Sequence, residues 1–422
     1  MAAPNFPEWL TSDFLKTCLE SDEEISGGIT VTSHTLEQAV APGNNYGSNM
    51  IRANVRYKKH GDSTNEHTVS LVIKAQLSED SFAAEQLKDN LKQLYHNETK
   101  YYYEFISETR KLSKHNVVPK HYKSPNPYCM VLEDLKVSGF EMVDRRKLLD
   151  FDHCKLFAEA SAKLHGLGIA LNNSNPELIK GFYFENDKLD DYMKLFMGNS
   201  LTYMATYLED KPTYKKQFDI IKELSENGIY WTIYKEMLEV CKTKPIQTLT
   251  QADPWCTNMM FRYSSGRVKA IKIVDFQCVK LNSPIVELVM FLSISANLEV
   301  RQTRMNDLYQ IYCDSLNGNL EEFGCSERLS MEDLNAEVTL LNPLVLLNLC
   351  LLPTVLTDAA LDMEEHLSVK SSAEEIKESS VYKTVFHSPH FEMNFPWIFD
   401  AHDKHGVFDY VLEKVREIKS RK

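Results

Sequence analysis

The sequence has no surplus of positive charge. Its 422 residues include 47 lysines and arginines against 60 aspartates and glutamates, a formal net charge of −13. A nucleic-acid-binding domain usually carries a strongly basic face, so overall charge argues against nucleic acid as a partner. Internal repeats and low-complexity tracts are also missing, while 43% hydrophobic and 25% charged residues are typical of a packed globular protein. The length exceeds what one hydrophobic core usually supports, which favours two lobes.

Cysteine pairs and long apolar runs are missing as well. The nine cysteines include no CxxC pair and no zinc-ligand spacing, which favours reduced thiols and a cytoplasmic location. No basic segment followed by an apolar stretch begins the sequence, so we expect no signal peptide. The longest apolar stretch, about 340–356, is interrupted by two asparagines and two prolines. We expect a buried helix there rather than a membrane span. Oligomeric state stays open, because no heptad pattern stands out.

The first third of the sequence has strand patterns. A short helix is expected near 9–20, followed by strands over 27–32, 50–57 and 68–75 and, further on, a buried strand over 128–132. Helical periodicity occupies 80–112 between the last two strands. The remainder is mostly helical, apart from a strand pair over 258–263 and 269–274, joined by a turn. This order predicts an α+β protein with a small N-terminal antiparallel-sheet lobe, 1–135, and a larger helical lobe, 136–422.

Three polar residues flank the late strand pair. Asp253 and Asn258 border the loop that enters its first strand, and Asp275 follows its second strand. A hairpin brings its two ends together, so Asn258 and Asp275 could face one site. Their oxygens suit Mg²⁺, and Asp253 could then accept a proton from an attacking hydroxyl, as in kinase-type phosphoryl transfer. Taken singly, each residue is more often a turn former or a helix cap.

Lys74 ends the mostly apolar strand segment 69–74. A lysine on a buried strand needs an anionic partner, although a lysine at a strand end can also reach water. Glu98, on the helix that follows, could supply the carboxylate, as the Lys–Glu pair does in kinases. The alternative for Glu98 is a solvated helix position.

Two further segments are candidates for nucleotide binding, and one histidine is a weaker candidate for a functional role. The turn 43–48 could cover phosphates with backbone amides, but it matches G-x-G-x-x-G poorly and could be an ordinary hairpin turn. The backbone of 133–135 lies where an adenine could bind, or is only a polar exit from a strand. His165 is expected to pack or cap rather than to catalyse.

With these segments in order, the chain resembles the ecdysteroid kinase-like family of insects, whose fold is similar to choline and aminoglycoside kinases. The likeness runs from about Gly43 to the helices beyond Leu356. Its most specific part is D-x-W-x-x-N-x-M-F at 253–261, followed by D-F-Q at 275–277. The other matching segments are Gly43–Ser48, Val72–Lys74, Glu98–Tyr102, Val131–Leu135, Leu164–Gly166 and Ser283–Leu288.

The resemblance implies a two-lobed protein-kinase-like fold and an ATP- and Mg²⁺-dependent kinase. Its acceptor would be a hydroxyl of an ecdysteroid, of another steroid, or of a lipophilic plant or xenobiotic compound. The implied residue roles are a catalytic base, Asp253; Mg²⁺ ligands, Asn258 and Asp275; a phosphate ligand and its orienting acid, Lys74 and Glu98; a phosphate-covering turn, Asn45, Tyr46, Gly47 and Ser48; and an adenine-binding backbone, Glu133 to Leu135.

The sequence departs from the family pattern around the catalytic loop. The family usually has His-Gly-Asp where this chain has Gln251-Ala252-Asp253, and Glu287 stands where an aspartate is common. Alanine adds a methyl group where glycine tolerates unusual backbone angles. A second hypothesis is therefore a catalytically weak module that binds nucleotide or a lipophilic ligand without turnover.

Overall fold

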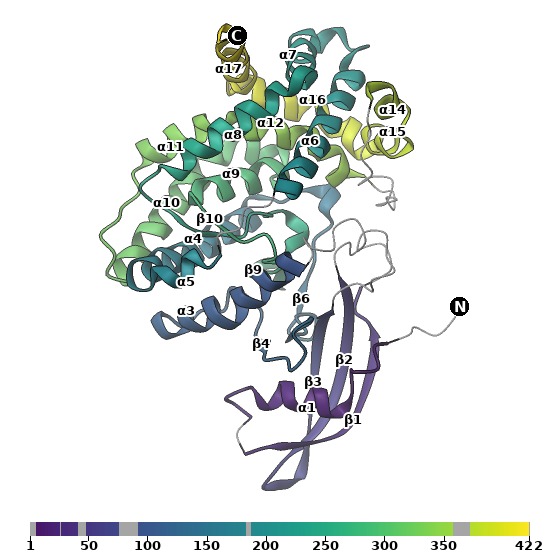
Figure 1. The fold of residues 1–422 in the computed structure, drawn as a ribbon, viewed down its shortest axis with the longest axis vertical. Coiled ribbons are helices and arrows are strands. Elements are labelled where there is room, and N and C mark those ends of the chain that lie inside the picture. Colours follow the sequence, from purple (N-terminus) through teal and green to yellow (C-terminus); the bar gives the residue numbers. More distant parts are fainter. Residues whose placement is uncertain are drawn as a thin grey trace. The chain divides into compact units, whose positions relative to one another are not determined.

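The computed structural model describes residues 6–25, 27–40, 48–75, 92–182, 187–357 and 372–421. The chain forms two compact units (Figure 1). The first comprises Met1–Glu141 and the short segment Lys272–Gln277, and the second comprises Met142–Ile271 and Cys278–Lys422. The segment 272–277, which includes Asp275, is thus packed in the first unit although most of the chain around it belongs to the second.

The first unit is built on a five-stranded antiparallel sheet with the order β1-β2-β3-β5-β4. Its strands are β1 Ile29–Gln38, β2 Asn49–Lys59, β3 Asp62–Ala75, β4 His121–Tyr122 and β5 Cys129–Glu133. Alternate side chains of β2 are buried, as expected for a strand with one covered face. The predicted strands are confirmed, and β1, β2 and β3 are longer than the sequence patterns indicated. A short β6, Phe140–Glu141, follows.

Helix α1, Ser12–Glu20, covers one face of this sheet (Figure 1). Thr11 caps its N-terminus by accepting a hydrogen bond from the backbone N–H of Phe14. Phe14, Leu15, Cys18 and Leu19 share one helix face and join Ile51, Val55, Leu71 and Ile73 in the core of the unit. The predicted short helix is therefore confirmed.

A second helical segment follows β3 in the first unit. Residues 92–100 are α-helical, η1 Tyr101–Ile106 is a π-helical turn, and α3 Ser107–Leu112 completes the segment. The predicted helix is confirmed over 92–112, whereas 76–91 lie outside the described residues. In η1 the ring of Tyr101 stacks on that of Phe276, with centroids 4.1 Å apart. This stack packs the segment 272–277 against the helix.

The second unit is mainly helical (Figure 1). Its longest helix, α4 Phe151–Ser174, is largely buried. The other α-helices are α5 Pro176–Lys180, α6 Asp187–Leu208, α7 Lys215–Ser225, α8 Ile229–Lys242, α9 Pro284–Ser295, α10 Met305–Glu322, α11 Met331–Leu340, α12 Asn342–Leu356, α14 Ala373–Glu378, α15 Ser380–Phe386, α16 Pro389–Lys404 and α17 Val407–Ser420. The shorter turns are η2 Arg145–Lys147, η3 Pro212–Tyr214, η4 Glu226–Gly228, η5 Cys256–Asn258 and η6 Val300–Arg304.

Short strands position the loop around Asp253. β7 Thr248–Thr250 pairs with β10 Lys280–Asn282 in antiparallel fashion. β8 Met259–Ser264 and β9 Arg267–Ile273 form the predicted hairpin. Its turn residues Ser265 and Gly266 have φ of 51° and 72°, which matches the right-handed twist of paired strands. The last residues of β9 pass into the first unit.

The longest apolar stretch forms α12, and nearly all of its side chains are buried. The prediction of a buried helix there is confirmed. Among the described helices, none alone combines the length and apolar character of a membrane span, and only the bent pair α11–α12 meets the criterion jointly. The predicted α+β class, an N-terminal antiparallel sheet followed by a mostly helical part, is confirmed.

Candidate active site

Lys74 lies at the centre of a buried charge cluster in the first unit. Its Nζ is 2.7 Å from Glu98 Oε2 and 3.0 Å from Asp275 Oδ1. The side chains of Lys74 and Glu98 are 9% and 2% exposed, whereas that of Asp275 is 28% exposed. The predicted ion pair between Lys74 and Glu98 is present, and Asp275 adds a second anion that the sequence did not indicate as a partner of Lys74.

The cluster shifts the proton equilibria of its members. Burial disfavours the ammonium form of Lys74, but the charges of Asp275 and Glu98 outweigh burial and raise the pKa of Lys74 above its ordinary value. Burial raises the pKa of Glu98, and the neighbouring Lys74 offsets only part of that effect. Lys74 is therefore a permanently charged group that contacts one buried acid, Glu98, and one partly exposed acid, Asp275.

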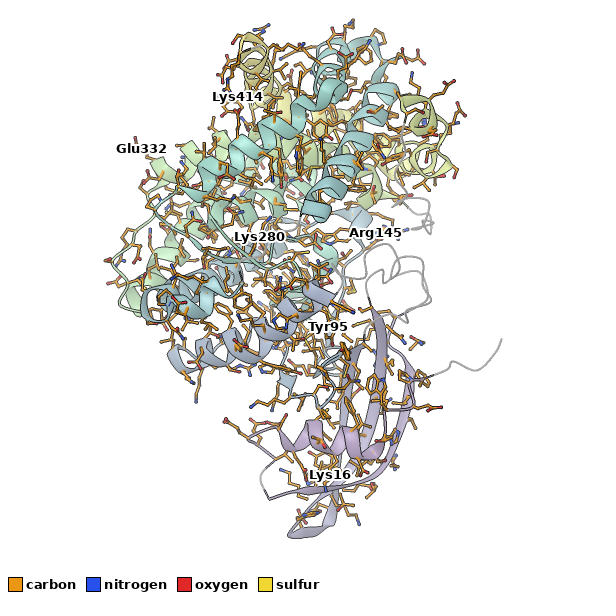
Figure 2. All side chains as sticks on the ribbon, in the orientation of Figure 1. Lys16, Tyr95, Arg145, Lys280, Glu332 and Lys414 are labelled. Carbon is orange, nitrogen blue, oxygen red and sulfur yellow. The ribbon has the colours of Figure 1, made fainter. Side chains whose placement is uncertain are left out.

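Neighbouring groups hold this cluster in place. Tyr95, labelled in Figure 2, donates its hydroxyl to the carbonyl oxygen of Lys74 at 3.1 Å. The other oxygen of Glu98 accepts a hydrogen bond from the backbone N–H of Phe276 at 3.2 Å. Asp275 itself has a φ of 64°, in the left-handed region that few non-glycine residues adopt. Such conformations persist where surrounding contacts impose them, often at functional sites.

In the second unit, Asp253 and Asn258 contact each other. The side-chain amide of Asn258 donates to Asp253 Oδ2 at 3.0 Å and to the Asp253 carbonyl oxygen at 2.9 Å. The turn η5 brings the two residues together despite their separation of five positions. Because the nitrogen of Asn258 faces Asp253, its amide oxygen points elsewhere and can serve as a ligand.

The residues before Asp253 depart from the family pattern, and the structure shows what each one does. Ala252 has a φ of 63°, so a glycine would fit this position without strain. Gln251 is buried, and its backbone N–H donates to Glu287 Oε2. The other oxygen of Glu287 lies 3.3 Å from Nε2 of His165. His165 is buried and packs, as predicted.

The remaining candidates lie in the first unit. Asn45, Tyr46 and Gly47 lie outside the described residues, and Ser48 is buried. The backbone N–H of Glu133 donates to the carbonyl oxygen of Lys120, and the Leu135 carbonyl accepts from Phe140 N–H at 2.9 Å.

One buried cation beside this segment was missed by sequence reasoning. Lys272 Nζ lies 2.9 Å from Glu133 Oε1 and contacts Asn116 Oδ1 and the Val118 carbonyl oxygen. Its side chain is 2% exposed. The only signal in the sequence was a lysine in an otherwise apolar stretch ahead of Asp275, a weaker version of the signal that singled out Lys74.

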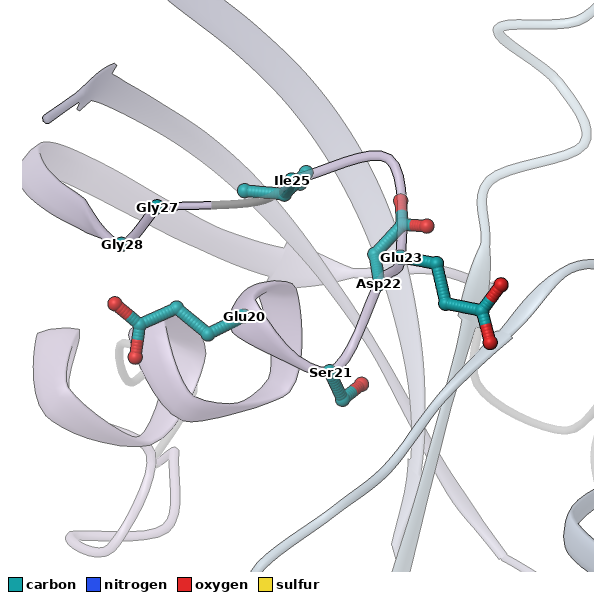
Figure 3. A pocket seen from close by; sticks show the side chains of 7 residues that line it. All are labelled: Glu20, Ser21, Asp22, Glu23, Ile25, Gly27 and Gly28. Carbon is teal, nitrogen blue, oxygen red and sulfur yellow. The ribbon is translucent and has the colours of Figure 1, made fainter. Parts of the chain in front are cut away.

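A cavity of about 450 Å³ lies elsewhere in the first unit, at the end of α1 (Figure 3). Glu20, Asp22 and Glu23 contribute to its lining. β1 begins beside this cavity with Ile29 paired to Lys59, whereas Lys74 pairs with Met50 at the other end of β2. The cavity is therefore separate from the cluster around Lys74.

A buried Lys–Glu pair on an antiparallel sheet, a D-x4-N loop and a following D-F-Q segment are features of kinase-type phosphotransferases. The model of the ecdysteroid kinase-like family matches residues 42–325. The chain belongs to this family, a family of phosphotransferases that act on small molecules. The predicted resemblance is thereby confirmed.

Comparison with solved structures gave several matches of low identity. A choline kinase from Cryptosporidium parvum Iowa II has 10% identity and a TM-score of 0.45, covering 89% of this chain and 91% of that chain. A choline/ethanolamine kinase family protein from Mesorhizobium loti has 15% identity and a TM-score of 0.37, covering 92% and 98%. A GDP complex of an aminoglycoside 2'-phosphotransferase has 10% identity and a TM-score of 0.37, covering 93% and 99%. No curated protein matched the chain. Family membership rests on the family model.

Proposed function

We propose that this protein transfers the γ-phosphoryl group of ATP, with Mg²⁺, to a hydroxyl of a small lipophilic alcohol. The observation that carries the proposal is the buried contact of Lys74 with Glu98 and Asp275. A lysine held between two acids is poised to bind phosphate oxygens as a fixed positive charge. Belonging to the ecdysteroid kinase-like family supports the same activity.

Nucleotide binding would use residues of the first unit. Lys74 would contact the α- and β-phosphates, and Glu98 would orient its ammonium group. Backbone amides of Asn45, Tyr46, Gly47 and Ser48 would cover the phosphates, and the backbone of Glu133 to Leu135 would meet the adenine. The GDP complex of the aminoglycoside phosphotransferase is a nucleotide complex of another kinase and supports a nucleotide as donor.

The residues proposed for Mg²⁺ fit that ion by the chemistry of their donors. Asp275 offers a carboxylate that is partly exposed, and Asn258 offers an amide oxygen turned away from Asp253. Mg²⁺ typically takes one or two protein oxygens and completes its shell with water and phosphates. In the described parts of the chain no group of three or more His, Cys, Asp or Glu is placed to hold a metal. When bound, Mg²⁺ would offset negative charge on the phosphates.

Asp253 would act on the acceptor. Asn258 holds one oxygen of its carboxylate, which fixes the direction of the side chain. In the reaction the acceptor oxygen forms a bond to the γ-phosphorus, the bond from that phosphorus to the bridging oxygen of ADP breaks, and Asp253 takes the hydroxyl proton. Positioning and electrostatic stabilisation supply most of the rate acceleration in such transfers.

The acceptor class is an ecdysteroid or another small lipophilic alcohol, which the family name supports. We place the reaction in the cytoplasm, because the nine cysteines of the sequence include no CxxC pair and no zinc-ligand spacing, as suits reduced thiols in a reducing compartment. Choline and an aminoglycoside belong in the acceptor panel because proteins of similar structure are named for them.

Single-turnover phosphorylation of this panel with labelled ATP tests the proposal. Asp253→Asn is expected to lower the rate by about 10²–10⁴-fold, the usual contribution of a general base. Asp210→Asn, at an exposed position of the same unit, is the matched control and should leave the rate unchanged. Equal rates for wild type and Asp253→Asn would overturn the assignment of the base.

One observation favours a second candidate, a module that binds nucleotide without turnover. Ala252 occupies a left-handed conformation beside Gln251, where the family usually has glycine and histidine. A thermal shift with ATP and Mg²⁺ but no transfer to any acceptor would support this candidate. Turnover created by the double change Gln251→His and Ala252→Gly would support it further, whereas turnover by the wild type excludes it.

A further inference from the structure

Three buried polar side chains from three helices form a chain of contacts that ends at the loop before Asp253. Tyr312 on α10 lies 2.8 Å from His165 Nδ1 on α4. His165 Nε2 lies 3.3 Å from Glu287 Oε1 on α9, and Glu287 Oε2 accepts from the backbone N–H of Gln251. Their exposures are 0%, 1% and 4% for Tyr312, His165 and Glu287. Placing such groups in a core costs free energy unless each has a partner.

The direction of these contacts is assigned from the donors and acceptors present. One oxygen of Glu287 accepts from the Gln251 N–H, and the other faces Nε2 of His165. We assign His165 the tautomer that carries its proton on Nε2, so that Nδ1 accepts a hydrogen bond from the hydroxyl of Tyr312. Burial, together with the charges of Glu287 and Glu337, raises the pKa of Tyr312 well above its ordinary value. Tyr312 therefore keeps the proton that it donates.

Helix α4 contacts the same loop at a second point. The hydroxyl of Thr248 on β7 donates to the carbonyl oxygen of His165 at 2.9 Å. A side chain at Gly168 would collide with Thr248 Oγ1, so glycine permits the close approach of β7 to the helix. β7 leads directly into Gln251. The backbone carbonyl of His165 therefore contacts this strand, while the side chain of His165 faces Glu287, which accepts from the Gln251 N–H.

The backbone of this loop is strained at one residue, Ala252. Ala252 follows Gln251 and has a φ of 63°, a left-handed conformation that is unfavourable for a non-glycine residue. Without outside contacts the segment would relax toward an ordinary backbone conformation and carry Asp253 with it. The hydrogen bond from Gln251 N–H to Glu287 opposes that relaxation directly.

We propose that Tyr312 is a positioning residue: through His165 and Glu287 it holds the backbone of 251–253 and so sets the place of Asp253. The kinetic consequence rests on the proposed function, whereas the effect on the Gln251 backbone does not. Tyr312 touches neither substrate nor nucleotide in this proposal. The role of Tyr312 has no counterpart in the sequence motifs that identified the site.

Amide hydrogen exchange at Gln251, followed by NMR in the full-length protein, tests the structural part. Tyr312→Phe removes one hydroxyl and should raise the exchange rate at Gln251 about 5–10-fold, the effect of weakening one hydrogen bond. Tyr309→Phe, a buried tyrosine one turn earlier on α10, is the matched control and should leave that rate unchanged. Unchanged exchange in Tyr312→Phe, or equal changes in both variants, would overturn the proposal.

A double-mutant cycle tests whether Tyr312 acts through Glu287. Glu287→Gln can still accept from Gln251 N–H, but it can present an amide nitrogen to His165. Exchange at Gln251 should therefore increase in Glu287→Gln, and adding Tyr312→Phe should increase it no further. Fully additive effects would mean that the hydroxyl of Tyr312 acts elsewhere and would contradict the proposal.

Kinetics separate this proposal from the proposed function. If the wild type transfers phosphoryl groups, Tyr312→Phe should lower kcat about tenfold with the KM for ATP unchanged, and Tyr309→Phe should leave both unchanged. An equal loss of kcat in the two tyrosine variants contradicts a positioning role. If the wild type shows no transfer, the proposed function fails while the exchange experiment still decides the positioning role.

Discussion

The ammonium group of Lys74 lies 2.7 Å from the carboxylate of Glu98, and both side chains are buried. In the interior, the attraction of such a pair mainly compensates for the water that both charges lose. The energetic importance of the pair therefore appears when one partner is removed, because the other charge is then left buried.

Replacing one partner should destabilise the protein more than replacing both. We expect Glu98→Leu to lower the free energy of unfolding by about 3–5 kcal/mol, since Lys74 keeps only Asp275 as its anion. Lys74→Met combined with Glu98→Leu should be less destabilised than Glu98→Leu alone. Urea unfolding measures these differences, and additive losses from the two single changes would contradict the account of the pair.

Ala252→Gly should stabilise the protein. Glycine adopts a φ of 63° without the clash that alanine suffers, although it also gains freedom in the unfolded chain. The net gain expected is about 0.5–1 kcal/mol in the free energy of unfolding. Ala205→Gly, within α6, is the control and should cost about 1 kcal/mol. Losses of equal size at both positions would show that the backbone of Ala252 is not strained.

Lys272→Met should destabilise the first unit. The substitution removes the donor for Glu133, Asn116 and the Val118 carbonyl; Glu133 keeps the backbone N–H of Lys120, whereas the carbonyl of the buried Val118 loses this donor. A loss of about 1–3 kcal/mol is expected from removing the donor of a buried acceptor. Lys269→Met, at an exposed position of β9, should change stability by less than about 0.5 kcal/mol. Thermal unfolding of the two variants side by side is the measurement, and similar midpoints would contradict this role of Lys272.

The free energy of unfolding should also decrease at acidic pH, because His121 has a lower pKa in the folded protein than in the unfolded chain. Burial, together with Arg110 and Lys123, lowers the pKa of His121 to about 4, from an ordinary value near 6.5. As pH falls below 6.5, the unfolded chain takes up this proton before the folded chain does. The contribution of His121 is therefore fully present above pH 6.5 and is lost down to about pH 4, a decline of about 3 kcal/mol at most.

His121→Phe tests this linkage, because phenylalanine keeps a ring beside Tyr102 and Tyr103 but cannot titrate. The free energy of unfolding of this variant should depend less steeply on pH between 6.5 and 4 than that of the wild type. The same substitution at exposed His60 is the control. Parallel pH profiles for wild type and His121→Phe would rule out the proposed burial of a neutral histidine.

Much of the fold could be predicted from the sequence. Alternating apolar residues predicted β2, β3 and the β8–β9 hairpin, since period-two patterning directly reflects one buried face. The π-helical turn at Tyr101–Ile106 could not be predicted, because it depends on how the helix packs against Phe276 rather than on local propensity. β1, β2 and β3 also extend beyond the segments predicted from alternating apolar residues, because hydrogen bonding to a neighbouring strand can include polar residues at the strand ends.

The candidate site was predicted in its residue types but only partly in its contacts. A lysine in an apolar strand pointed to Lys74 and its partner Glu98. Nothing local pointed to Tyr312, whose contact with the loop before Asp253 runs through the side chains of His165 and Glu287, from distant parts of the chain. Lys272 was missed for a similar reason: its acceptors come from 116–118 and 133, far away in the sequence.

The most direct test of the central claim is the Mg²⁺ dependence of phosphoryl transfer in two variants. If Asn258 and Asp275 are both Mg²⁺ ligands, Asn258→Ala and Asp275→Asn should each raise the Mg²⁺ concentration for half-maximal rate by more than about tenfold. The exposed control Asp210→Asn should leave it unchanged. A Mg²⁺ dependence identical to wild type in either variant would contradict the account.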